Sequence, residues 1–158
     1  QNVSIGGTNT NLTAAEANFT LMEATTVRAD TIQNDTSNGD LTIGTQGTGK
    51  IVLNADTSMA GAFIGSRQTI SGAGAINLTT LFTEITTTGA DAYSLANGTV
   101  GQVKIITMAV DGGDATITPT TFANGTSMTM DAVQDSVTLI YGANGWVVLA
   151  SQNVTINA

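Results

Sequence analysis

Regularly spaced turn signals dominate the second half of the sequence and restrict it to short strands. Turns rich in glycine, asparagine and aspartate occur at Asn97–Gly98, Asp111–Asp114, Asn124–Gly125 and 142–144, with runs of threonine and aliphatic residues between them. The chain holds 29 threonines and one proline, and β-branched side chains favour the pleated, half-buried surface of a strand. Turns about every 8–12 residues predict an all-β domain, either an antiparallel β-sandwich of the jelly-roll type or a barrel.

The chain separates into two regions of different character. Residues 1–68 are polar and rich in turns, and their apolar runs are short. We expect them to form an extended, stalk-like attachment region with short strands at 41–43 and 50–53. Residues 69–158 contain longer strand-like runs, and we expect them to form the β-sandwich domain.

Two local patterns concern the structure near the N-terminus. Thr13 and Glu16 have the spacing of a capping box, which favours a short helix as far as about Met22. A polar loop is the alternative, and the sequence leaves both open. Asn38–Gly39 is a hairpin-turn signal.

Gly44, Gly49 and Lys50 repeat the spacing of a phosphate-binding loop. Such a loop requires Ser or Thr directly after the lysine and a helix that begins there. Ile51 follows instead, at the start of an expected strand. The segment therefore predicts a glycine-rich hairpin.

The charge pattern argues against nucleic acid and membranes as partners. The net charge is −8, and the four basic residues (Arg28, Lys50, Arg67 and Lys104) are scattered along the chain. They form no basic patch that would neutralise a run of phosphates or bind an anionic bilayer. No apolar run approaches the roughly 18–20 residues of a membrane span.

The chain has no cysteine and no histidine. These absences exclude disulfides, thiolate zinc sites and imidazole acid–base chemistry. A two-carboxylate hydrolase site remains conceivable, but no motif fixes a pair of acids. We therefore expect a protein that is not an enzyme, with no catalytic residues and no cofactor.

Aspartates cluster at the expected turns of the second region. Asp111 and Asp114 flank two glycines, and this loop is the one candidate for a calcium site, because calcium prefers carboxylate and carbonyl oxygens. A turn in which aspartate accepts hydrogen bonds from its own backbone is the alternative. The loop lacks the longer ladder of acids that calcium loops use.

Trp146 and Tyr141 are the candidate ligand-stacking residues. They flank the turn at 142–144, where two aromatic rings would offer a platform to a sugar. The alternative is a core tryptophan, since Trp146 lies in a run with Val147 and Leu149. Strand alternation places Trp146 and Val148 on one face.

Several segments resemble phage virion proteins. Leu12–Asn18 is similar to the repeats of phage tail-fibre shafts, and residues 40–53 are similar to segments of marine phage fibres. The more extensive resemblance covers about residues 75–151, which are similar to a module of cyanophage and other marine phage virion proteins. Thr87–Gly98, Asp111–Pro119 and Gly145–Leu149 carry it. Members of this group sit in fibres, spikes and decoration proteins, so the resemblance implies a structural role.

These observations lead to one expectation with two alternatives. We expect a non-enzymatic homotrimer on the surface of a virion, a capsid decoration or fibre component that contacts capsid or tail proteins. One alternative is the receptor-binding tip of a tail fibre, with host surface glycans as partners. The other is a prokaryotic extracellular filament subunit, in which the strand around Val3 and Ile5 completes the sheet of the next subunit.

Overall fold

The computed structural model describes residues 41–45 and 51–158 of the chain. The chain divides into two units, residues 1–57 and 58–158. The expected capping box at Thr13, the turn at Asn38–Gly39, the N-terminal strand of the filament alternative and most of the glycine-rich loop lie outside the described residues.

The described part of the first unit contains no strand. Residues 41–43 and 51–53 belong to no strand, so the strands expected there are not formed. The apolar pattern of these segments is suited to a strand. However, a strand needs a neighbour to satisfy its backbone hydrogen bonds, and a single short hairpin is marginally stable in water.

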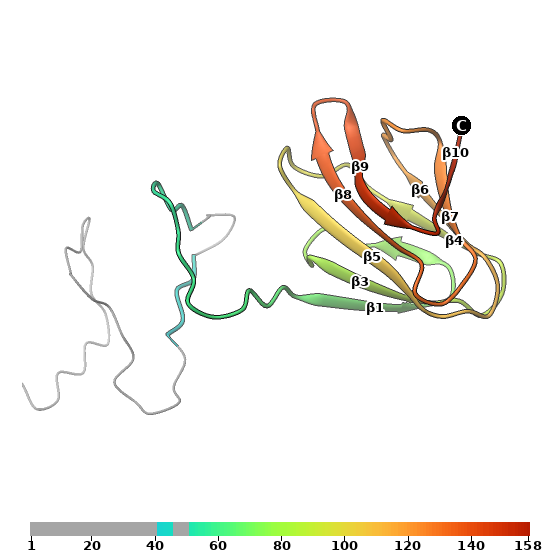
Figure 1. Ribbon diagram of the computed structural model, residues 1–158, viewed down its shortest axis with the longest axis horizontal. Helices are drawn as coiled ribbons and strands as arrows, with labels where there is room; N and C mark the ends of the chain where they lie inside the picture. Colours follow the sequence, from blue (N-terminus) through green and yellow to red (C-terminus); the bar gives the residue numbers. More distant parts are fainter. Residues whose placement is uncertain (1–40, 46–50) are drawn as a thin grey trace, which may run out of the picture. The chain divides into compact units, whose positions relative to one another are not determined.

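The second unit is all-β, as the turn spacing predicts, and within the described residues it contains no helix. Its strands form two five-stranded sheets (Figure 1). Sheet A has the order β1-β3-β5-β8-β9, and sheet B has the order β10-β7-β6-β4-β2. The strands are β1 (Arg67–Ser71), β2 (Gly74–Ile76), β3 (Phe82–Thr86), β4 (Asp91–Leu95), β5 (Val103–Val110), β6 (Ala115–Pro119), β7 (Ser127–Met130), β8 (Ser136–Gly142), β9 (Gly145–Gln152) and β10 (Thr155–Asn157). The expected boundary between residues 68 and 69 falls inside β1.

Strand pairing is mixed, and this corrects the expected antiparallel arrangement. The first six strands alternate between the sheets, so β1, β3 and β5 run parallel in sheet A, and β2, β4 and β6 run parallel in sheet B. Asn97–Gly98 and Asp111–Asp114 lie where the chain crosses to the facing sheet, not in hairpins. A turn signal shows where a strand ends, but it does not show which strand comes next to it. Of the two expected architectures, the domain is therefore the two-sheet sandwich and not a closed barrel, but its mixed pairing differs from that of an antiparallel jelly roll.

The later strands follow the predicted antiparallel pattern. β8 and β9 form the hairpin expected at 142–144, drawn in orange in Figure 1, and β6 pairs antiparallel with β7 across the turn at Asn124–Gly125. β10 pairs antiparallel with β7 and completes sheet B. A bulge in β9 near Leu149 leaves that side chain 59% exposed.

The core lies between the two sheets and follows the alternation of each strand. In β5, Lys104, Ile106 and Met108 point inward, while Val103 and Ile105 point outward. The buried apolar residues are Ile76, Ile85, Tyr93, Leu95, Ile106, Met108, Ala115, Ile117, Met128, Met130, Val137, Leu139 and Trp146.

The connecting loops at the two ends of the sandwich differ in charge. One end, here called the acidic end, carries the connections at 72–73, 87–90, 111–114, 131–135 and 153–154. The other, the uncharged end, carries the connections at 77–81, 96–102, 120–126 and 143–144, which contain no charged residue. Backbone hydrogen bonds from Asp91 N to Asp114 O and from Met108 N to Asp135 O tie the acidic-end loops together.

Candidate functional site

The loop with the candidate calcium ligands is packed tightly against its neighbour. Asp111 Oδ1 accepts a hydrogen bond from Gly113 N at 2.9 Å, and Gly112 N donates to Thr87 Oγ1 at 2.8 Å. A Cβ on Gly112 would lie 2.5 Å from the carbonyl oxygen of Thr87, so the loop needs glycine there. No group of three or more acidic side chains that would hold a metal exists in the part of the chain that the structure describes. Among the described residues, no third acidic side chain therefore joins Asp111 and Asp114 to hold a calcium ion.

Other aspartates at the acidic end also bind backbone groups, as expected for turn residues. Asp91 Oδ2 accepts from Thr88 N at 2.8 Å. Asp135 Oδ2 accepts from Asp131 N at 2.9 Å and from Ala132 N at 3.0 Å. Glu84 differs, because it forms an ion pair with Arg67 at 2.8 Å. Asp91 and Asp135 therefore stabilise the loops at the acidic end, whereas Glu84 links β3 to β1.

Asp135 is the most enclosed of these acids, and its role is testable. Its side chain is fully buried, and its Oδ1 atom has no hydrogen-bond partner. Asp135→Ala would leave two backbone donors, Asp131 N and Ala132 N, without their acceptor, so we expect the free energy of unfolding to fall by about 1–3 kcal/mol. Asp135→Asn keeps an acceptor of the same shape and is expected to lose less. Urea denaturation of both variants measures this, and equal losses would contradict the role of the acceptor.

Trp146 is buried, which decides between its two interpretations. The indole is fully buried, and its Nε1 atom donates to Ala96 O at 2.8 Å. Tyr141 meets it edge to face, with ring centroids 5.2 Å apart and an interplanar angle of 74°. A sugar needs an accessible ring face, so Trp146 is not a stacking platform in this structure. Tyr141 is only partly exposed and packs against the core.

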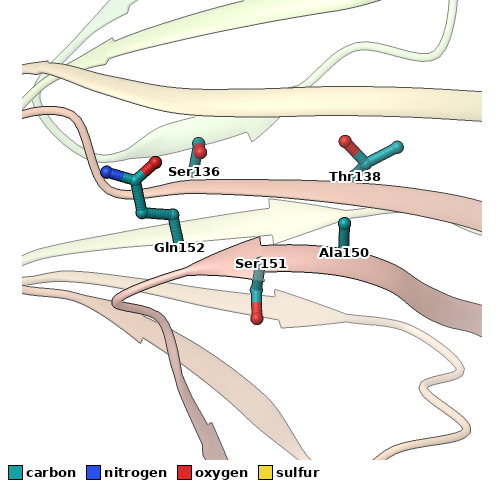
Figure 2. A pocket seen from close by; sticks show the side chains of 5 residues that line it. All are labelled: Ser136, Thr138, Ala150, Ser151 and Gln152. Carbon is teal, nitrogen blue, oxygen red and sulfur yellow. The ribbon is translucent and has the colours of Figure 1, made fainter.

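A shallow depression lies on the outer face of sheet A, where β8 and β9 carry small side chains. It has a volume of about 260 Å³ and is lined by Ser136, Thr138, Ala150, Ser151 and Gln152. Figure 2 shows Ser151 pointing away from Thr138 and Ala150, as strand alternation requires. Ligand pockets have volumes of roughly 300–1,000 Å³ and converging polar groups, so this depression lacks the form of one.

A buried lysine was not foreseen from the sequence. Lys104 Nζ lies inside the uncharged end and donates to Thr80 O at 2.8 Å and to Thr80 Oγ1 at 2.9 Å. Its side chain is fully buried. Burial lowers the pKa of the Lys104 amine to about 8. The sequence holds one signal for this burial: Lys104 lies two residues before the apolar Ile106, so strand alternation places both on the same face of β5.

The polar groups around Lys104 hold the connection between β2 and β3. Asn77 Oδ1 accepts from Thr80 N at 3.0 Å, and Gln68 Oε1 accepts from Asn77 N at 2.9 Å and from Thr83 Oγ1 at 3.2 Å. Lys104 thus completes a network that fixes a loop.

The outer face of sheet A carries a contiguous group of large apolar side chains. Phe82 pairs with Ile105 across β3 and β5, Val103 pairs with Ile140, and Ile140 pairs with Val147. All five point away from the core and are partly exposed. We call these five residues the apolar face; four of them lie near the uncharged end.

The outer face of sheet B is different in chemistry. Its outward positions carry only small or hydroxyl side chains, apart from Asn157. These are Ala75, Ala92, Ser94, Thr116, Thr118, Ser127, Thr129 and Thr155. A solvated sheet face normally carries polar residues of this kind, so only sheet A departs from the pattern.

Comparison with known proteins adds no identification. No protein-family model matches the chain, and no curated protein matches it. Among the described residues, no helix has the length and apolar character needed to cross a membrane.

Proposed function

We propose that this chain is a non-enzymatic structural protein of a phage-type particle, a homotrimeric capsid decoration or fibre component on the virion surface. Its partners are then other copies of itself and the capsid or tail proteins to which it attaches. The resemblance of residues 75–151 to marine phage virion modules supports the choice of particle.

The observation that carries the structural role is a run of exposed apolar side chains ahead of the sandwich. Eight large apolar residues between positions 41 and 64 are exposed, and Ile64 reaches 89%. The others are Leu41, Ile43, Ile51, Val52, Leu53, Met59 and Phe63. Burial of apolar surface yields about 25 cal/mol per Å², so association with other chains is the favoured state for this segment.

The charge distribution suits such a role. The acidic connections gather at one end of the sandwich. The segment at positions 41–64 contains a single acidic residue, Asp56. Apolar segments then pack between subunits, while the polar acidic surface faces water. The proposed mechanism is mechanical, with no bond made or broken.

Two measurements test this proposal. Antibodies against the chain are expected to label virus-like particles at discrete points in immunogold electron microscopy of the native source. Light scattering of the full chain is expected to give three times the monomer mass. Labelling confined to long helical polymers would favour the filament alternative, and saturable binding of the purified chain to host cells or glycans would favour the receptor-binding tip.

A further inference from the structure

We propose that the apolar face of sheet A is the surface on which a second copy of this chain docks. The inference rests on the proposed homotrimer and names the surface that holds it together. It concerns the sandwich, whereas the proposed function rests on the segment before it.

The two outer faces of the same sandwich provide an internal comparison. Both belong to five-stranded sheets of one domain, and both would contact water in a monomer. Sheet B has no large apolar residue at its outward positions, whereas sheet A has Phe82, Val103, Ile105, Ile140 and Val147 in adjacent registers. Contiguous exposed apolar groups of this kind mark interaction sites in soluble proteins. Sheet A therefore has the composition of a covered face.

The distribution of charge indicates which partner covers it. The net charge of −8 makes most approaches between two copies repulsive. The apolar face itself carries no charge, and the ion pair beside it, between Arg67 and Glu84, is internally neutral. The aspartates Asp91, Asp111, Asp114 and Asp131 lie at the acidic end. Contact through this face therefore keeps these aspartates away from the interface, and the one acid beside it, Glu84, is neutralised by Arg67.

A partner of different chemistry fits less well. A cationic protein would be drawn to the acidic end, because electrostatic attraction steers association toward opposite charge. The centre of a protein interface is depleted in charge and rich in large apolar side chains, which is the composition of this face. In a homotrimer each copy turns the same neutral, apolar surface toward the threefold axis and contacts both neighbours there, and symmetric self-association is the commonest form of assembly.

The neighbouring residues fit a docked face. Leu149 lies at the bulge in β9, two residues from Val147 of the apolar face, and is 59% exposed. Thr138 and Ala150 line a shallow hollow (Figure 2). Thr138 lies opposite Ile105 in the register of β5 and β8, and Ile140 is two residues further along β8. A large side chain of a second copy would fill that hollow.

The experiment compares lysine substitutions on the two outer faces of the full chain. Ile105→Lys and Ile140→Lys place a charge in the apolar face, and Thr116→Lys and Thr129→Lys place the same charge at central outward positions of sheet B. Analytical ultracentrifugation gives the dissociation constant, and circular dichroism confirms the fold. The sheet A variants are expected to dissociate at least about 100-fold more readily, whereas the sheet B variants stay assembled.

A milder variant provides a second test in case the lysine variants do not fold. The double substitution of Ile105→Thr and Ile140→Thr keeps β-branched side chains on the strands and is expected to weaken association in the same direction. Folded sheet A variants that remain trimeric would overturn the inference while the homotrimer stands. A wild-type monomer at every concentration would overturn both, and the face would then await another protein of the particle.

Discussion

Trp146→Ala is expected to lower the free energy of unfolding by about 3–5 kcal/mol, as for other large core aromatics. The indole is fully buried, and the residue forms hydrogen bonds with two connections at the uncharged end, 96–102 and 120–126. Its backbone N donates to Thr121 O, its backbone O accepts from Ala123 N, and its Nε1 donates to Ala96 O. Domains of this size are stable by about 5–15 kcal/mol, so the variant is expected to be partly unfolded at moderate temperature.

Trp146→Phe is the matched control for this prediction. It keeps an aromatic ring in the core but removes the donor to Ala96 O, so the expected loss is smaller, near 1–3 kcal/mol. Urea denaturation should be followed by circular dichroism, because the chain has a single tryptophan and both variants remove that fluorophore. A loss below about 1 kcal/mol for Trp146→Ala would show that the ring does not serve as a core residue.

The wild-type fluorescence separates the same two interpretations without a mutation. A buried indole emits at short wavelength and resists quenching by acrylamide. Emission at long wavelength, typical of an exposed indole, in the folded chain would favour the ligand-stacking interpretation of Trp146. The core interpretation was present in the sequence, since Trp146 begins a run that ends in Val147, Val148 and Leu149.

Local features of the fold were predictable, because they depend on neighbours along the chain. Threonine content and turn spacing predict the all-β unit, and the hairpin of β8 and β9 follows from the turn at 142–144. The same local logic accounts for the aspartates, since Asp91, Asp111 and Asp135 accept hydrogen bonds from backbone groups a few residues away.

Strand pairing was not predictable in the same way, because it depends on contacts between distant residues. The turn at Asn97–Gly98 is equally compatible with a hairpin and with a crossing to the facing sheet. The structure pairs β4 with β6 and β3 with β5, so the chain coils between two sheets. The run Val103–Met108 carries apolar residues at both sets of alternating positions, a pattern that is typical of strands in parallel sheets.

The burial of Lys104 was not predictable from the sequence for the same reason. A lysine in a strand is usually exposed, and its inward direction depends on the register of β5 against β8, where it lies opposite Leu139. Its burial against Thr80 depends on a loop that precedes it by more than twenty residues. The apolar face was missed likewise, because it assembles only when four strands lie side by side.

Stability is expected to rise with pH between about 8 and 10.5 because of Lys104. Burial lowers the pKa of its amine from 10.5 to about 8 in the folded chain. Below pH 8 both states hold the proton, so the cost of burying the charge is constant. Between the two values the unfolded chain holds a proton that the folded chain has released, and stability therefore increases with pH.

The size of this effect follows from the shift in pKa. One pKa unit corresponds to about 1.36 kcal/mol, so the whole shift is worth roughly 3 kcal/mol. Integrating the linkage places about 2 kcal/mol of it between pH 7 and 9.5. Measurements should stop near pH 9.5, because Tyr93 is buried and its pKa is raised above 10.0, and it reverses the trend at higher pH.

Lys104→Met removes the titrating group and provides the test. Urea denaturation of the wild type and of Lys104→Met at intervals from pH 7 to 9.5 is expected to show a relative gain for the wild type as pH rises. Arg67→Gln is the control, because it removes one positive charge from a side chain that is 62% exposed and should leave the slope unchanged. Parallel curves for the wild type and Lys104→Met would show that the amine is hydrated in solution. The hydrogen bonds to Thr80 would then hold the loop without burying a charge.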